Sequence, residues 1–371
     1  MQYPRISLLF MAFLPVFAGG CASDRPPSGG KNETTPLQVL LSDPAPSSIN
    51  ISTKSIRLTF NHEVTGRQML KALSITPPVG AYDITQKGKT IEVNTDKPLE
   101  SERTYIVSLN KNLQDNRGHS LPFPFTMAFS TGKKIDNGII NGTVVHEDFS
   151  PAKNALLLAF AEPSQKSGKG SLMNRIPEYI LQADASGGFS FRHIAAGSYR
   201  VVAIDDRNND MQYTPGEEGV GISSMGIIRT GTSHLLFRLS RSQQNGAHPK
   251  PKPVNQMAES AETGSISGKC FAVGKSVMIE ASSATALYRV PATREGNGIF
   301  YYIFQNLPPG SYTVSAYTPL GGKKRDAQQD WNPGTIMPFQ PADPFAFYAE
   351  KVTVRARWTT EHIDIRIKDS L

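Results

Sequence analysis

The residues with the clearest metal-binding pattern are four oxygen donors in one loop. With Asp206 as the first position, Asn208 is the third, Asp210 the fifth and Glu217 the twelfth. Calcium loops place oxygen ligands at such alternating positions. Met211 takes the sixth position, where such a loop requires glycine, so a solvated turn rich in Asp and Asn is the alternative interpretation. The spacing predicts a calcium site, and calcium is the one cofactor that the sequence suggests.

A second candidate site consists of aromatic side chains between Trp331 and Tyr348. Prolines interrupt this segment, which predicts a loop. On an exposed loop, Trp331, Phe345 and Tyr348 could stack on sugar rings or bind a partner protein. Apolar loop residues more often cover a hydrophobic core, so the alternative interpretation is that these aromatics close the end of their own domain.

Motifs of enzymes and of nucleic-acid-binding proteins are not found in the sequence. Gly88-Lys89-Thr90 and Gly274-Lys275-Ser276 end like phosphate loops but lack the first glycine. The seven histidines are isolated and form no metal-binding motif, which argues against a zinc site. We expect His62 and His119 to be solvated residues in turns. The sequence therefore predicts no catalytic residues, no zinc site and no nucleic acid partner.

The composition predicts β structure that is distributed over several domains. A chain of 371 residues exceeds one hydrophobic core, and 31 glycines with 27 prolines indicate many turns and few long helices. The net charge of +7 comes from scattered Lys and Arg residues that alternate with apolar residues, which indicates a solvated outer face. Cys270 lies in the alternating segment Gly264–Val273, which predicts a buried strand thiol without a disulfide partner.

Residues 1–20 have the features of an export signal that ends directly before Cys21. An apolar run follows Arg5, is too short to span a bilayer, and leads through small residues to the cysteine. This pattern resembles the bacterial lipobox, which implies cleavage, lipidation of the Cys21 thiol and attachment to a membrane. An ordinary secretory signal is the alternative interpretation. Residues 21–36 are polar and rich in Ser, Pro and Gly, which predicts a flexible tether.

The segment 37–132 consists of short alternating runs separated by turn residues, which predicts a two-sheet antiparallel sandwich. In one such run Ile56, Leu58 and Phe60 face one side. The segment resembles the bacterial Ig-like domain of the SbsA type in Asp43-Pro44, Leu99 with Thr104-Tyr105, Leu113-x-Asp115-x-x-Gly118, and Phe129-Ser130-Thr131-Gly132. The resemblance implies a tight turn at Asp115 to Gly118 and brings no catalytic residues.

Residues 133–241 and 264–371 are predicted to be two related sandwiches, joined by an extended Pro/Lys linker at 242–263. The corresponding segments are Gly138–Gly142 with Gly264–Gly268, Gly188–Phe191 with Gly298–Tyr301, and Ile194–Val201 with Leu307–Val314. A late strand is expected to run from Val352 to Trp358. Both units resemble the carboxypeptidase regulatory-like, prealbumin-like sandwich.

The sequence thus predicts an all-β chain of three tandem antiparallel β-sandwich domains, behind a cleaved lipoprotein signal peptide and a flexible tether. The whole resembles lipoproteins of the Bacteroidota, which implies a location at the outer membrane, on its periplasmic face or on the cell surface. On this interpretation the chain is a non-catalytic, lipid-anchored protein that displays interaction modules to another envelope protein. The alternative function is glycan binding beside a neighbouring enzyme or transporter.

Overall fold

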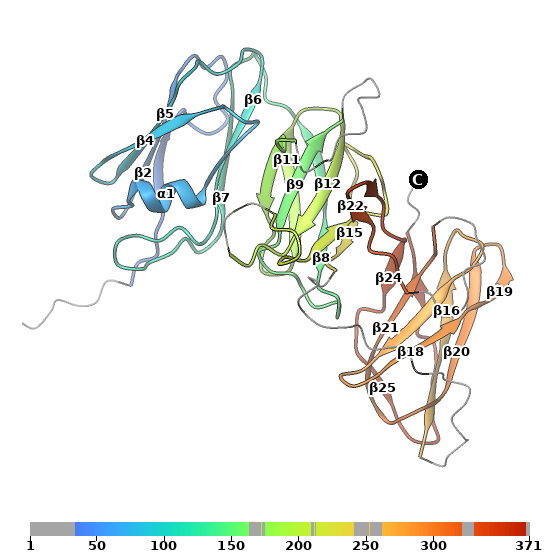
Figure 1. Ribbon diagram of the computed structural model, residues 1–371. Helices are drawn as coiled ribbons and strands as arrows, with labels where there is room; N and C mark the ends of the chain where they lie inside the picture. Colours follow the sequence, from blue (N-terminus) through green and yellow to red (C-terminus); the bar gives the residue numbers. More distant parts are fainter. Residues whose placement is uncertain are drawn as a thin grey trace, which may run out of the picture. The chain divides into compact units, whose positions relative to one another are not determined.

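The computed structural model describes residues 34–162, 172, 175–208, 211, 213–240, 252, 262–320 and 330–368. The chain divides into residues 1–35 and a compact unit from Pro36 to Leu371. In the described residues nearly all regular structure is β-strand, which confirms the all-β prediction (Figure 1). No described helix is long and apolar enough to cross a membrane. The predicted signal peptide and nearly all of the predicted tether and linker lie outside the described residues.

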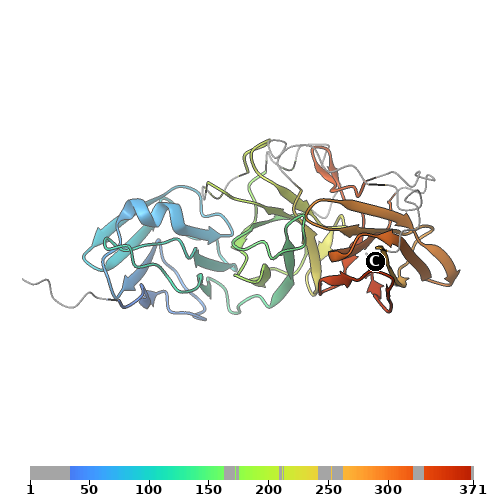
Figure 2. The same ribbon diagram turned by 90° about the horizontal axis from the view of Figure 1, so that it is seen from below.

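The first sandwich consists of two antiparallel sheets, which Figure 1 draws in blue and teal and Figure 2 shows from a second side. One sheet has the order β1 (Val39–Asp43), β2 (Ser55–Phe60), β5 (Thr90–Thr95), β4 (Tyr82–Lys87). The other has the order β3 (Leu73–Thr76), β6 (Thr104–Leu109), β7 (Phe125–Ser130). The predicted alternation is confirmed on β2, where Ile56, Leu58 and Phe60 are fully buried in the core.

A short helix, α1 (Gly66–Ala72), precedes β3 and was not expected from the sequence. Its start is fixed by a capping box, because the Thr65 hydroxyl accepts the Gln68 N–H and the Gln68 side chain accepts the Thr65 N–H. Met69 and Ala72 are buried against the sandwich core. The helix, which has seven residues, therefore covers part of that core.

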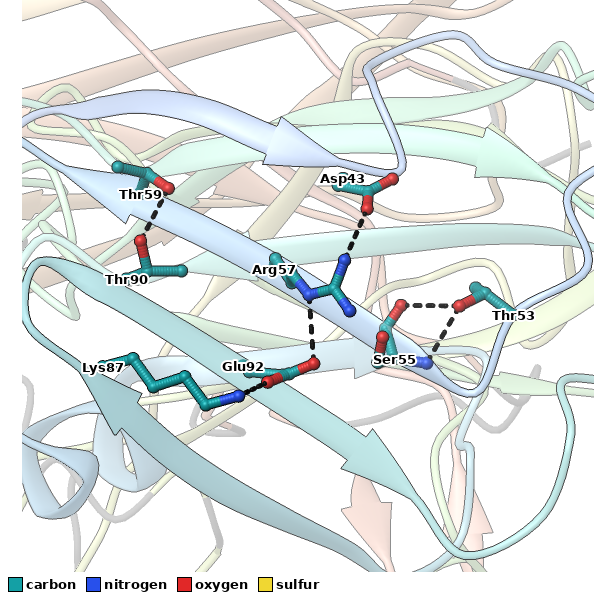
Figure 3. Close-up of polar contacts among 8 residues, drawn as sticks. All are labelled: Asp43, Thr53, Ser55, Arg57, Thr59, Lys87, Thr90 and Glu92. Atoms are coloured by element: carbon teal, nitrogen blue, oxygen red, sulfur yellow. Dashed lines mark hydrogen bonds and ion pairs between the residues drawn. The ribbon is translucent and has the colours of Figure 1, made fainter.

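The outer face of the first sheet carries a row of charges that crosses all four strands (Figure 3). Arg57 of β2 contacts Asp43 of β1 at 3.1 Å and Glu92 of β5 at 3.0 Å, and Lys87 of β4 contacts Glu92 at 2.9 Å. Such exposed cross-strand pairs specify strand register more than they add stability. Arg57 and Lys87 therefore lie on a solvated face, as predicted, whereas Arg238 and Arg289 are buried, in contrast to the prediction.

The second sandwich combines a larger and a smaller sheet. The larger has the order β10 (Tyr179–Gln182), β9 (Leu156–Ala161), β12 (Ser198–Ile204), β13 (Val220–Ile222), with β14 (Ile228–Arg229) also paired to β12. The smaller has the order β11 (Gly188–Ile194), β8 (Gly138–Val145), β15 (Leu235–Arg238). The β8–β15 pair is parallel, in contrast to the antiparallel pairs expected for this unit.

The third sandwich also has two sheets and adds a small hairpin. One sheet has the order β19 (Thr293–Gly296), β20 (Ile299–Leu307), β16 (Gly264–Phe271), β26 (Thr359–Thr360), with β27 (Ile365–Arg366) on β16. The other has the order β18 (Leu287–Pro291), β17 (Met278–Ser282), β21 (Gly310–Tyr317), β24 (Phe345–Phe347), with β25 (Val352–Val354) on β21. The hairpin pairs β22 (Thr335–Ile336) with β23 (Phe339–Gln340). Trp358 lies outside any strand and is 67% exposed, so the strand expected to reach it ends at Val354.

Strand pairing repeats between these two sandwiches. The first strand, β8 or β16, pairs antiparallel with β11 or β20 and parallel with the last strands, β15 or β26 and β27. In both units the second-last residue of the antiparallel partner strand has a positive φ, which is 59° at His193 of β11 and 58° at Asn306 of β20. This agreement in pairing and backbone supports the predicted internal repeat.

Candidate functional site

Two histidines and an aspartate from two separate segments of the sequence meet in the first sandwich: His62 from one, and Asp115 with His119 from the other. The Nδ1 atoms of His62 and His119 each lie 2.8 Å from the same oxygen, Oδ2 of Asp115. The two imidazole rings are tilted to one another, with centroids 5.2 Å apart. Because the three ligand atoms lie within 4.8 Å of one another, these side chains could hold a metal ion. We call this group the His62 cluster.

A tight turn orients the Asp115 carboxylate. Its Oδ1 atom accepts the backbone N–H groups of Arg117 and His119, both at 2.8 Å, so Oδ2 is left to face the imidazoles. The Gly118 N–H donates to the Asp115 carbonyl, and Gly118 has a φ of 88°, which glycine adopts without strain. The predicted turn from Asp115 to Gly118 is therefore confirmed, and it aims the carboxylate.

The segment that carries His62 is held in place by its neighbour Asn61. The Asn61 side chain accepts the Gln38 N–H at 2.7 Å and donates to the Pro36 carbonyl at 2.9 Å. Lys89 donates to the Asn61 carbonyl at 2.6 Å. These hydrogen bonds of Asn61 and Lys89 hold the backbone next to His62 in place, independently of any contact of the imidazole.

Burial and charge differ within the His62 cluster. The Asp115 side chain is 2% exposed, whereas the His62 and His119 side chains are 14% and 20% exposed. Burial raises the pKa of the Asp115 carboxyl, but hydrogen bonds from the His119 ring and from the His119 and Arg117 N–H groups outweigh it and lower this pKa to about 2. The carboxylate is therefore charged at neutral pH, and the imidazoles form the accessible side of the cluster.

This cluster was not predicted from the sequence. His62 and His119 were expected to be solvated turn residues, whereas both are partly buried around one carboxylate. The short spacing between Asp115 and His119 was a usable signal, since an Asp that caps a turn points toward the residues that follow it. The part played by His62 depends on the packing of β2 beside the turn, which spacing does not show.

The predicted calcium loop is described only in part. Asp206 is half-buried and its Oδ2 accepts the Met211 N–H at 3.2 Å, while Asn208 and Glu217 are exposed. Met211, at the position expected to be glycine, has a φ of 60°, which is the conformation that glycine favours there. Asp210 lies outside the described residues, so the calcium site stays a prediction.

The aromatic residues of the second predicted site contact other parts of the chain. The Trp331 indole N–H donates to the Asp343 carbonyl at 2.9 Å, and its ring meets Phe345 edge to face at 5.4 Å. The Arg238 guanidinium lies 4.7 Å from the centre of the Trp331 ring. Phe345 is buried and Tyr348 is half-buried. Ligand binding by these residues stays a prediction.

Of the two cysteines, only Cys270 lies within the described residues. Cys21 lies outside the described residues, so its lipidation stays a prediction. Cys270 is fully buried on β16, as expected for a strand thiol. Burial raises the pKa of the Cys270 thiol to about 12, which keeps it protonated and unreactive at neutral pH.

Comparison with known proteins gives one family match and several distant similarities. Over 146 residues the chain is 25% identical to Colossin-A of Dictyostelium discoideum, a match that spans 38% of this chain and 1% of Colossin-A. Among solved structures, PcoC, a methionine-rich copper resistance protein from Escherichia coli, is 17% identical with a TM-score of 0.21, covering 26% of this chain and 97% of PcoC. The N-terminal part of the bacterial S-layer protein SbsC is 18% identical with a TM-score of 0.20, covering 46% of this chain and 40% of that structure.

The family match is confined to the first sandwich. Residues 33–131 match the family model described as a bacterial Ig-like domain. This range agrees with the two sheets from β1 to β7 and with the resemblance expected from the sequence. In residues 33–131 the chain is therefore similar to bacterial Ig-like domains.

Proposed function

We propose that the chain is a non-catalytic envelope lipoprotein that is anchored through Cys21 and uses its β-sandwiches as structural or interaction modules. The observation that carries this proposal is the Ig-like domain at residues 33–131, followed by two further sandwiches with a repeated strand pairing. Such modules offer rigid binding surfaces, and what these surfaces meet depends on where the protein is held. A lipid on Cys21 would hold the protein at a membrane.

The lipid anchor is supported by the residues around Cys21. The short apolar run and the small residues before this cysteine follow the lipobox pattern. Two or three acyl chains, at about 0.8 kcal/mol for each buried CH₂, would hold the protein at the membrane permanently. The polar residues of 21–36 would then separate the Ig-like domain from the lipid surface.

Metabolic labelling with a clickable fatty acid tests the anchor in cells that make the protein. We expect label on the wild-type chain and on the Cys270→Ala variant, and no label on the Cys21→Ala variant. Cys270→Ala is the matched control, because it removes the other cysteine of the chain. Label that persists in Cys21→Ala, or that is absent from the wild type, would contradict the proposal.

One assay distinguishes binding to an envelope protein from the alternative function, which is glycan binding. A glycan array probed with the purified protein is expected to show no saturable binding. Saturable binding that Trp331→Ala abolishes would instead support carbohydrate recognition. Trp358→Ala is the control for a general aromatic effect, since Trp358 is exposed and lies outside the predicted site.

A further inference from the structure

We propose that His62, Asp115 and His119 form a binding site for a divalent transition-metal ion of the zinc class. The group offers two imidazole nitrogens and one carboxylate oxygen. Imidazole is a preferred ligand of Zn²⁺, Co²⁺, Ni²⁺ and Cu²⁺, whereas Ca²⁺ and Mg²⁺ are held by sets of oxygen ligands. The donor set therefore selects against the hard cations.

The spacing of the donors is close to what such an ion requires. In a tetrahedral zinc site with bonds of about 2.0 to 2.1 Å, neighbouring donor atoms are about 3.3 Å apart. Here Oδ2 of Asp115 lies 2.8 Å from each Nδ1, a hydrogen-bonding distance. Binding of an ion would require the donor atoms to move apart by about half an ångström, which small side-chain rotations supply.

The carboxylate is oriented before any ion arrives. Its Oδ1 atom is engaged by the Arg117 and His119 N–H groups at 2.8 Å, which leaves Oδ2 to serve as a single ligand atom. The backbone carbonyl of Asp115 also accepts the Gln68 side chain of α1 at 3.2 Å. Hydrogen bonds of this kind around a ligand fix its direction and raise metal affinity.

The exposure of the side chains gives an ion a way in. The buried Asp115 forms the floor of the site, while the partly exposed imidazoles form its rim. Three protein ligands leave a fourth position on a tetrahedral ion for water or for a group from another molecule. A bound ion would also tie the segment after β2 to the turn between β6 and β7, and so connect the two sheets of the Ig-like domain.

Titration of the purified full-length chain tests the site. After treatment with a chelator, isothermal titration calorimetry with ZnCl₂ is expected to show one saturable site that CaCl₂ and MgCl₂ do not occupy. His62→Gln and His119→Gln are each expected to weaken this binding at least about tenfold, since each removes a ligand. His362→Gln is the matched control, because His362 is exposed and lies in the third sandwich.

Two results would overturn the proposal. One is zinc binding of equal affinity and stoichiometry in the wild type and in the double variant His62→Gln/His119→Gln. The other is no saturable binding in the wild type, which would identify the cluster as a hydrogen-bonded group that needs no metal. A measurement on the wild type alone avoids the effect of misfolded variants: X-ray absorption of the zinc-loaded chain is expected to show two imidazole ligands, and a spectrum without imidazole would contradict the site.

Discussion

Two buried tyrosines, Tyr199 and Tyr312, occupy equivalent places in the second and third sandwiches. The Tyr199 hydroxyl donates to the Ala195 carbonyl at 2.7 Å, and the Tyr312 hydroxyl donates to the Pro308 carbonyl at 2.8 Å. In each case the tyrosine bonds to a carbonyl four residues earlier. This hydrogen bond closes the loop that leads into the tyrosine's own strand, β12 or β21. The tyrosine in each repeat therefore fixes the conformation of a loop in addition to filling the core.

The substitutions Tyr199→Phe and Tyr312→Phe are each expected to lower the free energy of unfolding by about 1 kcal/mol, because a carbonyl loses its hydrogen bond while the packing is kept. Urea denaturation measures the change. Tyr301→Phe, at a half-buried position on β20, is the control and is expected to have little effect. An unchanged stability in both test variants would show that these hydroxyl groups do not hold the loops.

Asp184 is one of the carboxyl groups that contribute to the pH dependence of the second sandwich. Its Oδ1 atom accepts the Ser186 hydroxyl at 2.6 Å, the Ser186 N–H at 2.8 Å and the Gly188 N–H at 3.0 Å. The hydrogen bond from the Ser186 hydroxyl is the largest cause that lowers the pKa of Asp184 in the folded chain, and the backbone N–H groups add to it. The charged form is thus favoured by folding.

A carboxyl with a lowered folded pKa stabilises the protein above its unfolded pKa of about 3.9, and this contribution is lost as the pH falls through the folded value. Asp184→Ala is therefore expected to cost about 1 kcal/mol near neutral pH and progressively less below about pH 4. Denaturation of both proteins at several pH values measures the difference. A difference that grows toward acidic pH would contradict the assignment.

Single residues also show where prediction from sequence fails. The Asp115 turn was predictable because its hydrogen bonds are local, and they are present. His62 was not, because its contact with Asp115 requires β2 and the turn after β6 to be packed in one domain. Side chains that depend on long-range packing carry no signal in their own neighbourhood of the sequence.

At the scale of elements, glycines set how closely parallel strands approach in the two repeats. A Cβ atom on Gly268 of β16 would lie 2.1 Å from the Ile363 carbonyl oxygen. In the second sandwich, a Cβ atom on Gly142 of β8 would lie 2.3 Å from the Leu235 carbonyl oxygen. Both glycines face the last segment of their sandwich, and only glycine permits this separation.

Gly268→Ala is expected to destabilise the third sandwich by about 1 to 3 kcal/mol, since the contact is with backbone that has to move. Thermal unfolding followed by circular dichroism measures the loss. Gly296→Ala in β19 is the matched control, because a Cβ atom there meets nothing within 4 Å and no positive φ is required. Equal effects of the two substitutions would contradict the role of close strand approach.

The strands themselves were largely predictable, and their partners were predictable only in part. Alternation placed Ile56, Leu58 and Phe60 on the buried face of β2, as the structure confirms. The parallel pairing of β8 with β15 was not expected, because alternation gives the buried face of a strand and not the direction of its neighbour. Helix α1 was not predicted, because it has only seven residues and is too short to show a repeating apolar pattern.

At the scale of the whole molecule, the chain is a series of β-sandwiches, of which the first matches the family model of a bacterial Ig-like domain. Turn residues, alternation and the internal repeat were enough to predict this architecture from the sequence. The function was harder to predict from the sequence, because the role of such modules depends on the location of the protein and on its binding partner. The proposal therefore depends most on Cys21.

The most direct test is mass spectrometry of the N-terminal peptide of the protein purified from the membranes of its producing cells. The account predicts a chain that begins at Cys21 and carries the mass of attached acyl chains on that residue. An N-terminal peptide with an unmodified Cys21, or one that still contains the residues before it, would contradict the account.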